Sequence, residues 1–244
     1  RAALMEVDEM KIMNVLLLMM VLCVPAFGQT TVDDWLNKGN TLIEQEQYDK
    51  AIDAFDQAIE IEPDNVTAWV GKGYALFNQS KYDEAIIALD KAIDIDPQNK
   101  YVWLIEGTVL CFQGRYDDAI AAFNKVIEID PEYADAWYCK GGAFYLQDKY
   151  NEAIDDFNKA IEINPEYANA WYYEGLAFYY EGKYKEAISA FDQVININPN
   201  DADAWYNKAE ALRMLHRDTE AKAAYAKARE LGYSGIMTLR ELTV

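Results

Sequence analysis

The sequence is poor in the residues that carry most enzyme chemistry. It contains one histidine, His216, and three cysteines among its 244 residues. No Cys or His group has the spacing of a zinc site, and the glycines do not form a phosphate-binding loop. Adjacent carboxylates such as Asp117 and Asp118 point in different directions on a helix, so they do not flank a substrate. We therefore predict no catalytic residue, no cofactor and no metal, and interpret His216 as a solvated turn residue.

Positive charge is also scarce. The 22 lysines and arginines face 42 aspartates and glutamates, which gives a net charge of −20. Such a surface repels phosphate backbones and anionic lipid headgroups. We therefore expect no nucleic acid as a partner. Because the acidic residues are dispersed along the chain, their simplest role is solubility.

Long apolar runs are absent except near the N-terminus. Ile12 to Val24 is an apolar run of 13 residues that follows Lys11. A helix of this length rises only ~20 Å, which is too short for a bilayer crossing. We expect a secretory signal over residues 1–28, with a translation start at Met10, and hence an exported protein, either extracellular or periplasmic. The alternative is an uncleaved anchor over residues 12–27, the one case in which we expect the chain at a membrane.

Two cysteines, Cys111 and Cys139, follow the expected signal. An exported protein could pair them, but two helical cysteines do not form a disulfide framework. We interpret them as small buried residues, and the sequence leaves their oxidation state open.

One spacing runs through the rest of the chain. Tryptophan recurs every 34 residues, and each of the first five is followed four residues later by glycine. The tryptophans are Trp35, Trp69, Trp103, Trp137, Trp171 and Trp205. This period divides residues 29–235 into six repeated units. The units span 32–65, 66–99, 100–133, 134–167, 168–201 and 202–235.

Each unit has the pattern of two helices joined by a turn. Trp69, Gly73 and Phe77 are four residues apart and share one face of a helix. The second half of the unit carries an apolar helical stripe. This stripe consists of Ala85, Ile86, Leu89, Ala92 and Ile93. Pro97 ends the second helix, and a lone hairpin cannot bury both of its apolar faces, so the units must stack.

The pattern resembles the tetratricopeptide repeat family. The family's residues occur in one unit as Trp137, Gly141, Phe144, Ala153, Phe157 and Pro165. The resemblance implies an all-α, right-handed superhelical solenoid of six helix-turn-helix repeats, whose concave wall is lined by the first helix of each repeat. One position departs from the family, which has leucine there. It holds Lys38, Lys72, Glu106, Lys140, Glu174 and Lys208.

The ends of the array differ from its interior. Thr31 followed by Asp34 predicts an N-cap. In the last unit, Lys222 and Arg229 replace isoleucines that would face a following repeat, which indicates a terminus. We expect residues 236–244 to form a short C-terminal capping helix, or else to lead into a longer protein.

The resemblance places a groove along the first helices, and tyrosine dominates it. Tyrosine combines a broad contact area with a hydroxyl group at low entropic cost. The expected groove residues are Leu36, Asn40, Tyr74, Phe77, Tyr101, Ile105, Tyr138, Tyr145, Tyr172, Tyr173, Tyr179, Tyr180 and Tyr206. The alternative for any single tyrosine is packing on a neighbouring helix, and we assign the tryptophans to the core.

Some family members bind a chaperone's C-terminal carboxylate through lysines and asparagines of this groove. Only Asn40 matches among the corresponding residues of the first three units, so we do not expect that ligand. We predict a non-enzymatic scaffold for a protein or peptide segment with apolar or aromatic anchors and basic flanks. The alternative is the recognition module of a larger enzyme or of a secretion or assembly factor. A weaker possibility is self-association, in which the C-terminal tail enters a neighbour's groove.

Overall fold

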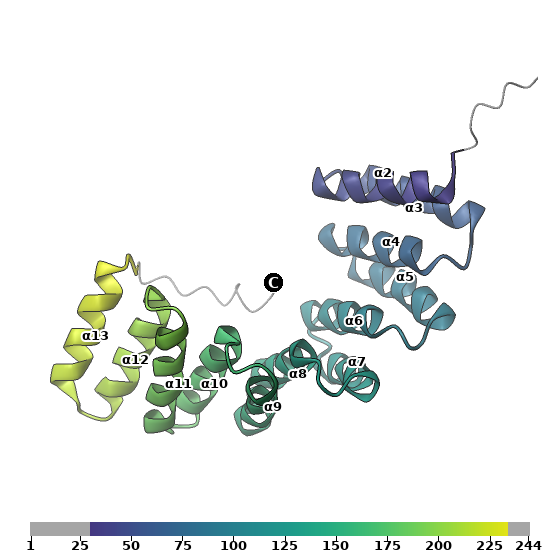
Figure 1. The fold of residues 1–244 in the computed structure, drawn as a ribbon. Helices are drawn as coiled ribbons and strands as arrows, with labels where there is room; N and C mark the ends of the chain where they lie inside the picture. Colours follow the sequence, from purple (N-terminus) through teal and green to yellow (C-terminus); the bar gives the residue numbers. More distant parts are fainter. Residues whose placement is uncertain (1–29, 234–244) are drawn as a thin grey trace, which may run out of the picture.

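A computed structural model describes residues 30–233, and within this range all regular structure is helical (Figure 1). The helices come in pairs, one pair in each 34-residue unit. The first helices are α2 (Val32–Glu44), α4 (Val66–Asn78), α6 (Lys100–Phe112), α8 (Ala134–Leu146), α10 (Ala168–Tyr180) and α12 (Ala202–Met214). The second helices are α3 (Tyr48–Ile61), α5 (Tyr82–Ile95), α7 (Tyr116–Ile129), α9 (Tyr150–Ile163), α11 (Tyr184–Ile197) and α13 (Asp218–Glu230).

The hairpins stack in sequence order into an open arc (Figure 1). Each second helix packs on the first helix of its own unit and on the first helix of the next unit. First helices of adjacent units also contact one another, and they lie on the inner side of the arc. The predicted all-α repeat solenoid is therefore confirmed, and its inner surface consists of first helices.

Side-chain caps define the starts of several first helices. Thr31 and Asp34 form a capping box, as the sequence predicts. Asn65 and Asp201 accept hydrogen bonds from the backbone N–H groups of Ala68 and Ala204. The turn inside each hairpin contains one residue with positive φ, a conformation that favours glycine. His216 occupies such a turn with φ of 58° and is exposed, as expected for a solvated turn residue.

In four of the six hairpins, the core contains a glycine of the first helix that faces a phenylalanine ring of the second. A Cβ atom on Gly141 would lie 2.8 Å from two ring carbons of Phe157, and one on Gly39 would lie 2.6 Å from Phe55. Phe157 and Phe55 are fully buried. The glycines therefore allow the ring of the second helix to pack directly on the backbone of the first.

The tryptophans are half-buried, and their indole groups are anchored by hydrogen bonds. In the last five units the indole Nε1–H donates to the proline carbonyl oxygen six residues earlier, for example from Trp69 to Pro63 at 2.8 Å. Each tryptophan thus ties the start of its unit to the loop that leaves the preceding unit. The expectation of core positions holds only in part, because one edge of each ring stays accessible.

Three lysines at the position that departs from the family pattern, Lys72, Lys140 and Lys208, form ion pairs. Lys72 Nζ lies 2.6 Å from Asp56, and Lys208 Nζ lies 2.5 Å from Asp192 of the preceding unit. Both ammonium groups also lie over the tryptophan of their own unit, at 5.7 and 5.2 Å from the ring centroid. The aliphatic part of each lysine therefore packs where the family has leucine, while the ammonium group is neutralised by the aspartate and lies over the tryptophan ring.

The expected signal over residues 1–28, the alternative anchor over 12–27 and the capping helix over 236–244 lie outside the described residues. Between residues 30 and 233, no helix is long and apolar enough to cross a membrane.

Candidate functional site

The inner surface of the arc is built from rings where adjacent first helices meet. The rings of Phe77 on α4 and Phe112 on α6 have centroids 4.8 Å apart in an edge-on arrangement. Further along the array, Tyr145 on α8 and Tyr180 on α10 are 6.1 Å apart. The repeat geometry thus aligns aromatic side chains from successive units along one surface.

Three of the expected groove tyrosines are exposed to solvent. Tyr74 is 42% exposed, Tyr101 is 58% exposed and Tyr180 is 57% exposed. They come from α4, α6 and α10, so they sample most of the length of the arc. Exposed rings of this kind provide the contact area of an interface at low entropic cost.

The remaining expected groove residues lie deeper. Tyr145 and Tyr173 are each only 8% exposed and belong to the hydrophobic core, so they offer almost no surface to a partner. Tyr138 is half-buried, with its ring 6.0 Å from the core ring of Phe157. For these three rings the packing alternative describes the structure better.

The other expected groove residues are intermediate between these two groups. Asn40 is exposed, and the rest are half-buried. They are Leu36, Phe77, Ile105, Tyr172, Tyr179 and Tyr206. The Tyr172 hydroxyl accepts a hydrogen bond from the Asn207 side chain at 2.9 Å, which restricts its ring. That a partner contacts these residues stays a prediction.

Two surface residues on the first helices were missed by the sequence analysis. Phe112 completes the aromatic pair with Phe77, and Met214 at the end of α12 is 37% exposed. Both are found at the unit position that Tyr180 occupies. That shared register is the signal that could have identified them.

Most of the positive charges on the first helices are paired with carboxylates. Six lysines and arginines lie on the first helices, and five of them are in ion pairs. These five are Lys72, Lys100, Lys140, Lys208 and Arg213, while Lys38 lies over the ring of Trp35. Glu44 and Asp33 are exposed on α2. The inner helices therefore present little free positive charge, and carboxylates at one end.

Buried carboxyl groups occupy two positions on the inner helices. Glu106 is 9% exposed and Glu174 is 3% exposed. Burial raises the pKa of each to about 7, and for Glu106 the nearby Asp90 carboxylate contributes in the same direction. Both carboxyls stand where other units have lysine.

The described residues offer little else with catalytic or metal-binding chemistry. Residues 30–233 contain no group of three or more His, Cys, Asp or Glu side chains arranged to hold a metal ion. Cys111 and Cys139 are free thiols that pack in one hydrophobic cluster. Burial raises the pKa of both thiols to about 12, which keeps them protonated and unreactive near neutral pH.

The fold and its aromatic inner surface define a helical repeat solenoid of the protein-interaction type. Sequence comparison specifies the family. The tetratricopeptide repeat models match residues 36–100, 134–167 and, in two segments, 107–148 and 175–215. The chain belongs to the tetratricopeptide repeat family, whose members are generally non-catalytic scaffolds. No curated protein sequence matches the chain significantly.

Solved structures of repeat proteins are similar to it. The structure of MamA is 31% identical, with a TM-score of 0.62, and the match covers 65% of this chain and 93% of MamA. A tetratricopeptide repeat protein from Parabacteroides merdae is 21% identical, with a TM-score of 0.70 and coverage of 83% and 80%. YrrB, described as a repeat protein with an unusual peptide-binding site, is 23% identical, with a TM-score of 0.62 and coverage of 78% and 98%.

Proposed function

We propose that this protein is a non-enzymatic scaffold that binds a segment of another protein along its inner surface. The observation that carries the proposal is the exposure of Tyr74, Tyr101 and Tyr180 on three first helices. An extended or helical segment with apolar or aromatic side chains suits such rings, because each ring offers one anchor.

The charge of the protein predicts which residues flank the anchors of the bound segment. Five of the six cations on the first helices are already paired with carboxylates, whereas the whole chain carries −20. Lysines or arginines beside the anchors would be attracted to this surface and would accelerate encounter. An acidic segment would be repelled.

One similar structure supports the proposal. YrrB, which shares the fold, is described as having a peptide-binding site. Export of the protein belongs to the proposal as well, and it rests on the sequence of residues 1–28 alone.

The first prediction concerns peptide selectivity. We expect a peptide of about twelve residues with aromatic anchors and lysine flanks to bind more tightly than the same peptide with glutamate flanks or with serine at the anchors. Fluorescence anisotropy titration measures each Kd. The triple variant Tyr74→Ala, Tyr101→Ala and Tyr180→Ala should weaken binding at least about tenfold, or about 1.4 kcal/mol.

A matched control lies on the second helices. Ile61, Ile87 and Ile197 are 52%, 61% and 39% exposed, so they resemble the three tyrosines in accessibility. Their triple alanine variant should bind as the parent does. Equal losses in both variants, or equal binding of the lysine- and glutamate-flanked peptides, would exclude the inner surface as the binding site.

A further inference from the structure

The two ends of the array carry very different charge. The first unit, residues 32–65, holds two lysines against ten acidic residues, a net of −8. The last unit, residues 202–235, holds six lysines and arginines against five acidic residues, a net of +1. The four units between them carry −2, −3, −4 and −3. The array therefore has a strongly acidic end and a weakly basic end.

Inside the array, one apolar contact recurs at the junctions between units. Ile161 near the end of α9 packs in one cluster with Ala170, the third residue of the next unit. Ile93 and Val102 make the corresponding contact between α5 and α6. The junction thus pairs a late residue of each second helix with an early residue of the following first helix.

At the two ends of the array, these same positions are charged. Arg229 on α13 occupies the position of Ile161, and Asp34 on α2 occupies the position of Ala170. Both side chains are exposed. If a second copy continues the stack in the register of the internal junctions, Arg229 of one copy comes opposite Asp34 of the other.

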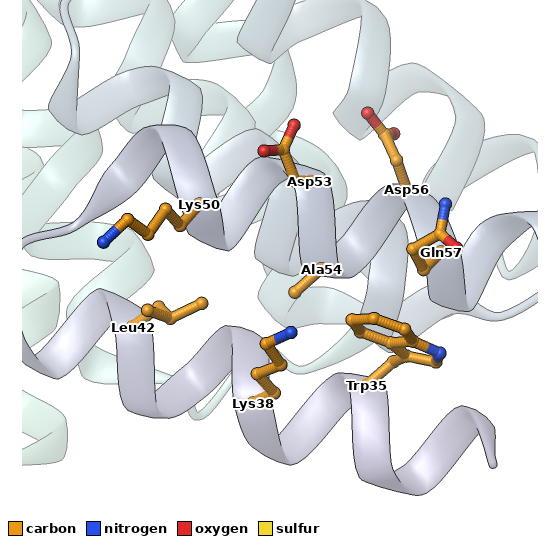
Figure 2. Close-up of a pocket in the computed structure, with 8 residues that line it drawn as sticks. All are labelled: Trp35, Lys38, Leu42, Lys50, Asp53, Ala54, Asp56 and Gln57. Carbon is orange, nitrogen blue, oxygen red and sulfur yellow. The ribbon is translucent and has the colours of Figure 1, made fainter. Parts of the chain in front are cut away.

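The acidic end also has an open groove between its two helices. Figure 2 shows this groove, which has a volume of about 430 Å³ and is lined by Trp35, Lys38 and Leu42 from α2 and by Ala54 and others from α3. In the second unit, the residue equivalent to Leu42 is Leu76, which is buried in one cluster with Ile52 of the preceding second helix. The first unit lacks this preceding helix within the described residues.

The basic end offers side chains that suit this groove. Lys222 occupies the position that Ile52 has in the first unit, so in the continued stack its aliphatic stem lies beside Leu42. Ala226 replaces Asp56 and Asp192, so Lys38 does not repeat the ion pairs of Lys72 and Lys208 and lies over the Trp35 ring instead. The charge pair that this register brings together across the junction is therefore Arg229 with Asp34.

We propose that the protein associates head to tail, with α13 of one copy packed on α2 of the next. Such a contact uses two different surfaces and does not close, so it generates short linear oligomers rather than a fixed dimer. The inner surface stays accessible in the oligomer, because the contact involves the ends of the arc only. This inference does not depend on the peptide-binding proposal.

The second prediction tests this contact by sedimentation velocity on the full chain, from about 1 µM to about 200 µM at about 0.15 M salt. The average mass should rise with concentration. Either D34R or R229D alone should weaken self-association at least about tenfold. A mixture of the two variants should regain the parent's association, because each mixed junction again places an arginine opposite an aspartate, and the double variant should regain it for the same reason.

Charge changes away from the ends provide the control. Glu152 and Lys185 are exposed on α9 and α11, so E152K and K185E should associate as the parent does. Circular dichroism of every variant establishes that it is folded. A monomer at all concentrations overturns the proposal, as would happen if residues 234–244 covered α13. Association that D34R and R229D leave unchanged overturns it as well.

Discussion

At the scale of single residues, Glu174 occupies a position where four other units carry lysine. Its side chain is 3% exposed, and burial raises its pKa from the ordinary 4.5 to about 7. Because the folded state binds the proton more tightly than the unfolded state, the protonated form supports folding. The stabilisation from protonated Glu174 is complete at pH values below its pKa in the unfolded state. It is lost as the pH rises through its pKa in the folded state.

The third prediction follows from this loss of stability with rising pH. Glu174→Gln keeps the shape of the side chain but removes the charge, so the variant should be more stable than the parent at about pH 8, by about 1–3 kcal/mol. At about pH 4 the two proteins should be nearly equal. Urea unfolding at several pH values measures the difference. Exposed Glu152→Gln is the control, and parallel pH profiles for Glu174→Gln and the parent would contradict the prediction.

At the scale of the hairpin, two neighbouring glycines on α8 have opposite roles. A Cβ on Gly141 would meet the Phe157 ring at 2.8 Å and the Ala153 carbonyl oxygen at 3.2 Å, whereas a Cβ on Gly142 would meet nothing within 4 Å. The first glycine is required by packing. The second only adds backbone freedom to the unfolded state.

The fourth prediction compares these two positions. Gly141→Ala should destabilise the protein by about 1–3 kcal/mol because the hairpin must open around the added methyl group. Gly142→Ala should stabilise it by up to about 1 kcal/mol because alanine is the better helix former. The midpoints of urea unfolding test both. Similar midpoints for the two variants would show that the ring of Phe157 moves aside without cost.

At the scale of the whole molecule, the charge of −20 acts against the folded state. Like charges held on one compact array repel each other, and salt screens this repulsion. The repulsion is strongest in the first unit, which contains ten acidic residues and only two lysines.

The fifth prediction is that the melting temperature rises by a few degrees between about 0.01 M and about 0.2 M sodium chloride. Asp33→Asn with Glu44→Gln should reduce this rise, because both carboxylates are exposed in the acidic unit. Lys222→Gln with Arg229→Gln should enlarge it. Scanning calorimetry measures all three proteins, and a melting temperature that falls with salt would show that ion pairs such as Lys72–Asp56 outweigh the repulsion.

Much of the fold could be predicted from the 34-residue period. Tryptophan, glycine, phenylalanine and proline recur because helix pairing imposes the same local demands on every unit, as Trp137, Gly141, Phe157 and Pro165 show. Helix formation and hairpin packing depend on residues close in sequence, so their pattern is readable along the chain. The capping box of Thr31 and Asp34 is local in the same sense.

The exposure of the tyrosines could not be read in this way. Tyr145 and Tyr179 occupy the same position of two adjacent units, yet Tyr145 is buried and Tyr179 is only half-buried. Neighbouring units cover the first ring more than the second, and burial of this kind depends on how the units lie against each other. The ion pair of Lys72 with Asp56 likewise joins residues of different units. Periodicity along the chain specifies the repeating hairpin, but only the stacking of hairpins decides which side chains a partner can reach, because that depends on contacts between residues distant in sequence.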